Sequence, residues 1–305
     1  MKIIITGGAG FIASHIADAY VKAGHKVVII DNFLTGFRKN LNPKAKFYKA
    51  DIRNLALMKK IFRKEKPDVV NHHAAFISVA GSVKQPKSAF ENNVMGTLNV
   101  VLAFEQSSRK SKRLIFSSTG GAIYGNPKHI PADETTLPAP LSPYALSKLI
   151  DEEIIKFFCG QFGIEYLILR YSNVYGPRQN PMGEAGVVAI FGGLLKNGVR
   201  PTIFGDGTKT RDYVYVGDVV RANVLGLICG RNETVNICSG REASDQKIFD
   251  TIARALKTKQ GPTYAPFREG EVMRIAMDFR KAKKILGWSP KVELEEGIKN
   301  TLKSL

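Results

Sequence analysis

Hydrophobic and polar positions follow two alternating patterns along the first 170 residues. Short apolar runs typical of buried strands lie at Lys2 to Ile5, Lys26 to Ile30, Lys46 to Tyr48, Asp68 to Asn71, Arg113 to Phe116 and Glu165 to Leu169. Segments with helical periodicity lie between them, at Phe11 to Ala23, Leu55 to Lys64, Lys87 to Ser107 and Pro143 to Phe162. This alternation predicts an α/β fold with a doubly wound parallel sheet and helices on both faces.

The pattern changes after about Gly176. Short strands, loops and scattered helices follow, with glycine- and proline-containing breaks at "YGPRQNPMGEAG" and "GPTYAPFREGE". We therefore predict a first domain over residues 1–175 and a smaller C-terminal α/β lobe over residues 176–305, with residues of about 210–235 as candidates to return to the first domain. A cleft between the two would be the natural substrate site.

Composition describes an ordinary soluble protein of 305 residues, 44% of them hydrophobic and 24% charged. The longest apolar stretch, Val187 to Leu195, is too short to cross a bilayer. The start "MKIIITGG" passes into glycines without a signal-type apolar region, so we expect a cytoplasmic protein.

The formal charge of +18 keeps a nucleic-acid binder open as a hypothesis. The lysines are spread along the chain without a block of interleaved aromatics, which favours phosphorylated small substrates and makes nucleic acid the less expected partner. Three cysteines without CxxC spacing and five histidines without an HExxH motif give no reason to expect a metal.

The stretch "TGGAGFIAS" opens the first predicted helix directly after the first strand. Gly7 allows a tight turn, Gly10 lets backbone amides approach a pyrophosphate, and the helix N-terminus favours negative charge. Ala13 stands where a third glycine is usual. The pattern is typical of a Rossmann-type dinucleotide site.

Asp31 ends the second predicted strand. A carboxylate at this distance from the glycine loop can accept hydrogen bonds from both ribose hydroxyls of adenosine, and its charge repels a 2′-phosphate. This favours NAD over NADP. The alternative is an aspartate that only ends the strand.

The stretch "SPYALSKL" places Tyr144 and Lys148 one helical turn apart, because Ser142 and Pro143 suit the N-cap and first helical position. A nearby ammonium and an oxidised nicotinamide would lower the pKa of the phenol, giving a general base for an alcohol. By itself, YxxxK is common on amphipathic helices and is a weak signal.

The fifth predicted strand runs into "SSTGGAIYG", which supplies three hydroxyls at the carboxyl edge of the sheet. One position in this stretch is expected to lie beside the alcohol oxygen that Tyr144 would deprotonate. Counted forward from Phe116 that position is Thr119, whereas counted back from Tyr124 it is Gly120. Only Thr119 supplies a hydroxyl, and the choice between it and Ser118 stays open.

These motifs occur in the order found in the extended short-chain dehydrogenase/reductase family, which the chain resembles nearly end to end. Within it the chain is similar to the nucleotide-sugar 4-epimerases. The resemblance is carried by "TGGAGFIASH", "VVIIDN", "HHAA", "ENNVMGTLNV", "FSSTGGAIYG", "SPYALSK", "LRYSNVYGPRQ", "GEAGVVAIF", "IFGDGTKTRDYVYVGDV" and "LGWSPKVELEEGI". It implies an NAD-dependent isomerase of galactose metabolism that interconverts UDP-glucose and UDP-galactose through a 4-keto sugar.

The resemblance also implies a role for individual residues. The catalytic residues would be Tyr144, Lys148 and Thr119. NAD would contact Gly7, Gly10, Phe11, Ile12, Asp31, Asn32, Asp51, Ile52, His73, Ala74, Ala75, Asn93, Ser117, Tyr144, Lys148 and Ser172. The UDP-sugar would contact Thr119, Asn173, Gly186, Val187, Arg211, Arg268 and Glu271. The alternative for Arg211 and Arg268 is that each forms a surface ion pair without contacting substrate.

Two departures from the family pattern besides Ala13 could alter affinity: Glu271 stands where aspartate is usual, and His73 stands where other residues are commoner. The smaller Ile275 falls where some relatives carry a tyrosine beside the sugar 2-substituent, so action on UDP-GlcNAc and UDP-GalNAc is a hypothesis. The helices at Lys87 to Ser107 and Pro143 to Phe162 are those that pair in dimers of this family, so we expect a homodimer.

Three alternatives accompany this interpretation. A 4,6-dehydratase is disfavoured, because Gly120 and Gly121 stand where those relatives carry a proton-transferring aspartate and glutamate. A uronic-acid 4-epimerase or nucleotide-sugar decarboxylase is a closer competitor. A non-catalytic NAD- or RNA-binding scaffold of the same fold is the third.

Overall fold

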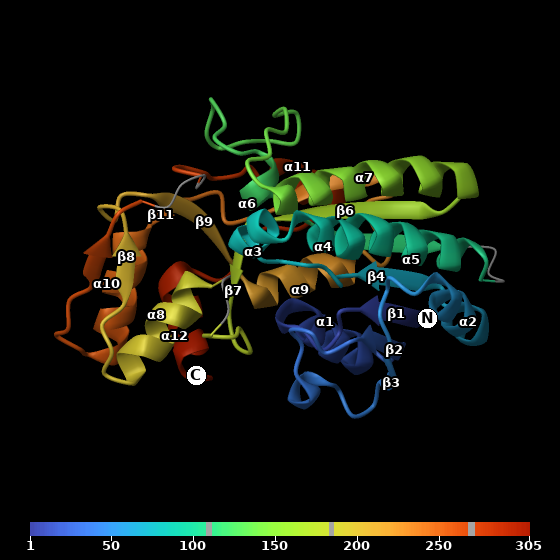
Figure 1. The fold of residues 1–305 in the computed structure, drawn as a ribbon, viewed down its shortest axis with the longest axis horizontal. Helices are drawn as coiled ribbons and strands as arrows, with labels where there is room; N and C mark the ends of the chain where they lie inside the picture. The colour runs from blue at the N-terminus through green and yellow to red at the C-terminus, as the bar shows by residue number, and fades with distance from the viewer. Residues whose placement is uncertain (108–111, 183–185, 268–271) are drawn as a thin grey trace.

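A computed structural model describes residues 1–107, 112–182, 186–267 and 272–305. Its centre is a seven-stranded parallel sheet in the order β10-β6-β5-β4-β1-β2-β3 (Figure 1). The strands are β1 Lys2–Thr6, β2 Lys26–Asp31, β3 Lys46–Lys49, β4 Val69–His72, β5 Arg113–Thr119, β6 Glu165–Tyr171 and β10 Glu233–Ile237. The doubly wound fold predicted from the sequence is confirmed.

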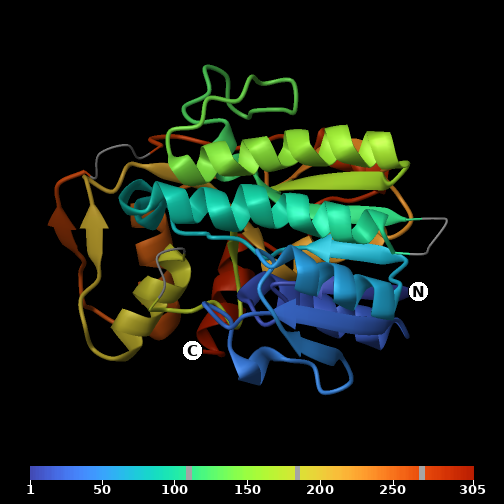
Figure 2. The same cartoon turned by 45° about the vertical axis from the view of Figure 1, so that its right-hand side comes forward.

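Helices cover both faces of this sheet because its strands are apolar on both sides. Ile3 and Ile5 face a core shared with α1 (Phe11–Lys22) and α9 (Val216–Leu225), whereas Ile4 faces α2 (Leu55–Glu65), α5 (Gly96–Glu105) and α7 (Pro143–Phe162). All three isoleucines are fully buried, and each such burial stabilises the fold by roughly 1.5–3 kcal/mol. Figure 2 shows α5 and α7 side by side along one face.

The segment predicted as a single helix from Lys87 to Ser107 is interrupted. It begins as α4 (Pro86–Phe90), passes through a π-helical turn, η2 (Glu91–Met95), and continues as α5. The short α3 (Val79–Lys84) precedes it. A π-helical turn accommodates an extra residue and often marks a functional site. Here it carries Asn93.

Helix α7 has the bounds predicted for it. The Ser142 hydroxyl accepts a hydrogen bond from the Ala145 amide at 3.2 Å, Pro143 occupies the first turn, and Gly163 ends the helix with φ of 63°. These end signals are local in sequence. They fix where Tyr144 and Lys148 stand.

The smaller lobe has its own core and two small sheets, one in the order β11-β9-β7 and one pairing β12 with β8. Its strands are β7 Asn173–Tyr175, β8 Thr202–Phe204, β9 Thr210–Tyr215, β11 Glu242–Ser244 and β12 Thr263–Ala265. Its helices are α8 Val187–Lys196, α10 Asp245–Leu256 and α12 Leu294–Leu302. The short elements η1 Arg38–Asn40, α6 Gly120–Ile123 and α11 Arg280–Leu286 complete the described chain.

The chain crosses between the two units more than once. After β9 it returns to the large unit, where α9 packs against α1 and β10 pairs with β6. Near the C-terminus, Leu286 and Trp288 also join the core of the large sheet. The expected boundary at residue 176 therefore marks only the first of several crossings.

Candidate active site

The predicted cofactor residues gather at one edge of the sheet. Because its strands are parallel, the carboxyl ends of β1, β2, β4, β5 and β6 lie on the same side. The strand order reverses between β1 and β4, and such a switch point is where open α/β sheets bind ligands.

The glycine loop after β1 is shaped for close approach. Gly7 has φ of 70°, and a Cβ on it would lie 2.7 Å from the Ala74 nitrogen. Gly10 caps α1, and its amide donates to the Gly7 oxygen at 2.9 Å. Phe11 and Ile12 begin the helix, and Ala13 is buried against the core. The loop therefore needs glycine at position 7 on grounds of backbone conformation and of space.

Asp31 and Asn32 link the loop to the next strands. Asp31 accepts hydrogen bonds from the Ala9 amide at 3.0 Å and the Phe33 amide at 2.7 Å. Asn32 donates to Asp51 at 3.0 Å. The neighbouring Arg53 guanidinium lowers the pKa of Asp51 to about 2, so this carboxylate is ionised. Asp31 thus holds the loop and stands at the position expected for ribose recognition.

Two further residues of the predicted NAD set are buried supports. Ile52 packs against the start of α5, where a Cβ on Gly96 would overlap its side chain. The Asn93 side chain bonds both backbone groups of Phe76, at 2.7 and 3.1 Å, and donates to Ser147 on α7 at 2.8 Å. Asn93 therefore ties the loop after β4 to the helix that carries Tyr144.

The two histidines after Asn71 have different surroundings. His72 is fully buried, whereas His73 starts the loop that continues through Ala74 and Ala75. The His73 Nε2 lies 3.3 Å from the Tyr171 hydroxyl, and its Nδ1 is buried with no hydrogen-bond partner among the described residues. Burial lowers the pKa of His73 to about 3, so the ring is neutral.

An unpartnered buried nitrogen beside a glycine loop fits a bound dinucleotide, which brings polar groups of its own. Because Gly7 carries no side chain, its backbone packs directly against the backbone of Ala74 in the loop after β4. The residues present therefore fit NAD.

The catalytic residues predicted from the sequence are brought together by α7 and the end of β5. Burial raises the pKa of Tyr144 to about 12, and a hydrogen bond that the phenol oxygen accepts from the Thr119 hydroxyl opposes that rise. Lys148 is buried, with its Nζ 3.8 Å from the centre of the Phe116 ring. Burial also lowers the pKa of Lys148.

The structure distinguishes the hydroxyls at the end of β5. Ser118 is buried and donates to Glu152 at 2.6 Å, while Glu152 also pairs with Arg170 at 2.7 Å. Ser117 and Thr119 are partly exposed, as alternation along a strand requires. Thr119 is therefore the hydroxyl that faces Tyr144, and Ser118 belongs to the support behind the strand.

Within "SSTGGAIYG", β5 ends at Thr119 and the single helical turn α6 begins at Gly120. A Cβ on Gly120 would overlap the Met277 sulfur, and one on Gly121 would lie 3.0 Å from the Asn173 side chain. A side chain at Gly120 would displace the end of the Met277 side chain, and one at Gly121 would press on Asn173.

The predicted substrate residues lie on several elements. Asn173 begins β7, Arg211 lies on β9, and Gly186 with Val187 begins α8. Ser172, which was predicted to contact NAD, lies between β6 and β7. Arg211 is partly exposed and donates to the Thr210 backbone oxygen at 2.8 Å. The other two predicted residues, Arg268 and Glu271, lie outside the described residues.

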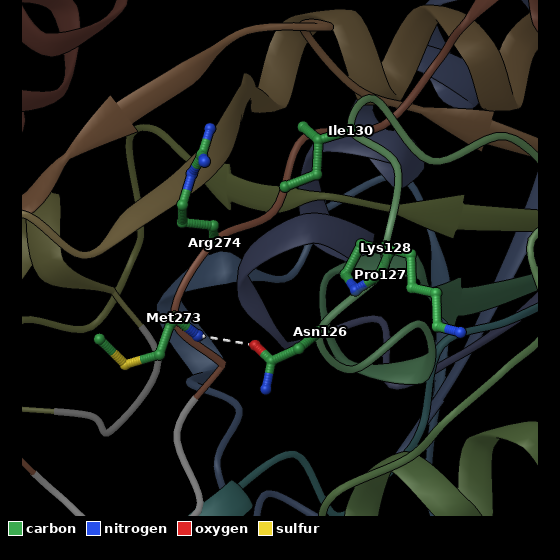
Figure 3. Close-up of a pocket in the computed structure, with 6 residues that line it drawn as sticks. All are labelled: Asn126, Pro127, Lys128, Ile130, Met273 and Arg274. Carbon is green, nitrogen blue, oxygen red and sulfur yellow. Dashed lines mark hydrogen bonds between the residues drawn. The ribbon is translucent and has the colours of Figure 1, made fainter.

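Ile275 is buried in a small cluster with Tyr124, Ala132, Cys238 and Met277. An open cavity of about 390 Å³ adjoins it, lined by Asn126, Pro127, Lys128, Ile130, Met273 and Arg274 (Figure 3). The Asn126 side chain accepts a hydrogen bond from the Met273 amide at 2.9 Å across it. None of these lining residues was predicted to bind cofactor or substrate.

Comparison with known proteins identifies the family. The family model described as GDP-mannose 4,6 dehydratase matches residues 4–301. The chain is 48% identical to a putative UDP-glucose 4-epimerase of Methanocaldococcus jannaschii over 98% of its length and 97% of the relative. The chain belongs to this family of extended short-chain dehydrogenases/reductases.

Solved structures of the family share the whole fold. The UDP-glucose 4-epimerase of Thermotoga maritima with UDP-glucose has a TM-score of 0.97 and 45% identity, covering 100% of this chain and 98% of that one. The Thermus thermophilus UDP-glucose 4-epimerase with NAD has a TM-score of 0.94 and 39% identity, with the same coverage. A UDP-N-acetylglucosamine 4-epimerase of Methanobrevibacter ruminantium has a TM-score of 0.93 and 33% identity, covering 99% and 97%.

The described part of the chain lacks two kinds of feature. It contains no cluster of histidine, cysteine or carboxylate side chains suited to a metal ion. No helix in the same ranges combines the length and apolar character needed to cross a bilayer.

Sequence reasoning missed the residues behind Lys148. Asp151 lies one turn further along α7, with its Oδ2 3.5 Å from the Lys148 Nζ. The i,i+3 spacing in "SKLID" was the available signal, but it does not tell a buried pair from a solvated one.

Proposed function

We propose that this protein is an NAD-dependent UDP-glucose 4-epimerase, which interconverts UDP-glucose and UDP-galactose through a 4-keto sugar. The observation that carries the proposal is the contact between Tyr144 and the Thr119 hydroxyl at the end of β5. Lys148 lies one helical turn from Tyr144 along α7. The relatives in the family that act on UDP-glucose support it.

When bound, NAD supplies the hydride acceptor and donor for the sugar C4. Tyr144 removes the proton of the 4-hydroxyl as the hydride leaves, and it returns the proton when the hydride comes back. Thr119 hydrogen-bonds the same oxygen. The Lys148 ammonium would hold the nicotinamide ribose, and a positive charge one helical turn from Tyr144 would favour ionisation of the phenol, whose pKa burial raises to about 12.

Epimerisation also requires the sugar to present its second face. The chain would grip the nucleotide diphosphate through Asn173, Gly186, Val187 and Arg211, and the sugar would turn about its bond to the diphosphate. Arginine suits this task because its planar fork pairs with phosphate oxygens. Arg268 and Glu271 stay predicted members of this set.

The dehydratase alternative lacks the side chains that it requires at α6. Elimination of water needs an added acid and base, and Gly120 and Gly121 supply neither. The matching family model takes its name from a dehydratase, but these positions separate the chain from that chemistry.

The range of sugars is a second part of the proposal. We expect UDP-GlcNAc to be accepted, because Ile275 is smaller than tyrosine and a UDP-N-acetylglucosamine 4-epimerase shares the fold at 33% identity. UDP-glucuronate is the competing substrate class. Turnover of UDP-glucose without turnover of UDP-GlcNAc would refute the wider range.

The test is turnover of purified protein with UDP-galactose, UDP-GlcNAc and UDP-glucuronate, with product sugars separated by chromatography. Absorbance at the wavelength of reduced nicotinamide reports transient hydride transfer. We expect conversion of UDP-galactose and its loss in a Tyr144→Phe variant. Binding of RNA with a steep salt dependence and no sugar turnover would support the scaffold alternative instead.

We further propose a homodimer built on α7 and the neighbouring helices. Val83, Met95, Leu146 and Phe157 are large apolar side chains that are 41–62% exposed on this side of the molecule. Light scattering coupled to gel filtration tests this, and a monomeric mass would refute it. The cytoplasmic location expected from the sequence stays a prediction.

A further inference from the structure

Asp151 shares one face of α7 with the catalytic pair. Residues 144, 148 and 151 are spaced i, i+4 and i+7, so they stack along the helix. The Asp151 side chain is 0% exposed and that of Lys148 is 4% exposed, with Oδ2 and Nζ 3.5 Å apart. A carboxylate is seldom buried so completely, because removal from water costs several kcal/mol unless a partner compensates.

A buried chain of hydrogen bonds leads from the start of the glycine loop to Thr97, which lies close to Asp151. The Thr6 hydroxyl accepts from two backbone amides after β4, at 3.2 Å each, so its own proton is free to reach His72 Nδ1 at 2.6 Å. The single proton of the neutral His72 ring is then on Nε2, which donates to the Thr97 hydroxyl at 3.0 Å. Thr97 lowers the pKa of Asp151, whose two carboxylate oxygens are buried without a hydrogen-bond partner among the described residues.

The titratable groups around Lys148 include two histidines at the end of β4 and two carboxylates on α7. Burial keeps the rings of His72 and His73 neutral, so neither places a positive charge beside Lys148. Asp151 and Glu152 both raise the pKa of Lys148, Asp151 the more strongly, and Glu152 is also paired with Arg170 at 2.7 Å. Asp151 is therefore the main counter-charge of the Lys148 ammonium, whose Nζ also lies 3.8 Å from the centre of the Phe116 ring.

We propose that Asp151 is a positioning residue for this reaction: its carboxylate keeps the Lys148 ammonium charged and fixed beside Tyr144 and the cofactor ribose. The inference rests on the proposed function, since the charge on Lys148 matters when Tyr144 is the base. It assigns a task to a side chain that touches neither sugar nor nucleotide.

Loss of the Asp151 carboxylate should lower the pKa of both Lys148 and Tyr144. Asp151 raises the pKa of Lys148, which burial lowers, so its removal makes Lys148 lose its proton at lower pH. Asp151 also raises the pKa of Tyr144, so its removal eases ionisation of the phenol. The acidic and the alkaline limb of the plot of turnover against pH are therefore both expected to move to lower pH.

The experiment compares wild type with Asp151→Asn by turnover of UDP-galactose and by calorimetric NAD affinity, from about pH 6 to pH 10. We expect both limbs of turnover to move to lower pH by about one unit, and NAD affinity to fall with rising pH earlier than in wild type. Superimposable profiles would overturn the proposal. A lower rate with unmoved limbs indicates a packing defect and overturns it equally.

Two more variants keep the test decisive. Asp151→Glu retains the charge and should keep the alkaline limb at the wild-type position, even if folding or rate suffers. If Asp151→Glu and Asp151→Asn share one limb position, charge is not the cause and the proposal fails. Glu153→Gln removes an exposed carboxylate from the same helix and should move neither limb.

The NAD measurement separates this inference from the proposed function. If wild type fails to convert any UDP-sugar but the NAD affinity of Asp151→Asn shifts with pH, the epimerase proposal fails and the positioning role stands. If wild type is active and neither measurement shifts, the positioning role fails alone.

Discussion

Replacing Gly7 by alanine tests whether the loop after β1 is built for a dinucleotide. Gly7 has φ of 70°, and its Cβ would lie 2.7 Å from the Ala74 nitrogen and 2.9 Å from the Ala74 Cα and the His73 carbonyl carbon. All three are backbone atoms, which cannot rotate away. Gly24 offers a matched control, because its φ is 82° and nothing lies within 4 Å of its Cβ position.

The two substitutions share one cost and differ in another. A left-handed alanine costs roughly 1–2 kcal/mol, and the stiffer unfolded chain returns about 0.4–1 kcal/mol, so Gly24→Ala should cost about 1 kcal/mol. Gly7→Ala adds displacement of the segment after β4, where overpacking costs typically 1–3 kcal/mol. That segment carries His73, Ala74 and Ala75 of the predicted NAD site.

Thermal unfolding and NAD titration distinguish these effects. Gly24→Ala should lower the Tm by about 2–4 °C and leave NAD affinity unchanged. Gly7→Ala should lower the Tm further and weaken NAD at least about tenfold, which corresponds to about 1.4 kcal/mol. The assignment of this loop to NAD would be refuted by a Gly7→Ala protein that binds NAD as tightly as wild type.

Further predictions concern the end of β5 and α7. Tyr144→Phe should lower kcat by about 10²–10⁴ while NAD affinity measured by calorimetry is retained; full turnover would exclude Tyr144 as the base. Thr119→Val should lower kcat about tenfold or more without lowering the Tm appreciably. Ser118→Ala should do the reverse, keeping kcat but losing about 1 kcal/mol in chemical denaturation because its bond to Glu152 is buried; equal effects of the two on kcat would contradict the assignment of Thr119. Glu152→Gln should cost about 3–5 kcal/mol in the same denaturation assay because it leaves Arg170 buried without its counter-charge, and a loss below 1 kcal/mol would mean that water reaches the guanidinium.

Elements with strong local signals could be predicted from the sequence. Helix α7 has Ser142 and Pro143 at its start and Gly163 after its end, and the structure gives it the predicted bounds. The glycine loop and Asp31 are similarly local, since turn, helix start and strand end lie within 31 residues. These signals place Tyr144, Lys148 and the loop without reference to distant contacts.

Features that depend on distant pairing were not predictable. The stretch "ETVNI" of β10 is short and half polar, and it becomes a strand because it pairs with β6. The π-helical turn at Asn93 hides within a continuous helical pattern, because one inserted residue barely changes the periodicity. The choice between Ser118 and Thr119 needed the strand to continue beyond Phe116, so that alternation turns one hydroxyl toward Glu152 and the other toward Tyr144.

The repeated crossing of the chain has a consequence for how this molecule is made. During synthesis, β6 emerges as an edge of the growing sheet and stays uncovered until β10 follows, more than 60 residues later. Trp288 completes the same core only as the last residues appear. The unit built on the large sheet therefore cannot finish folding before the smaller lobe has been made. A fragment that ends at residue 176 should expose the β6 edge and aggregate, so the two units are expected to fold together.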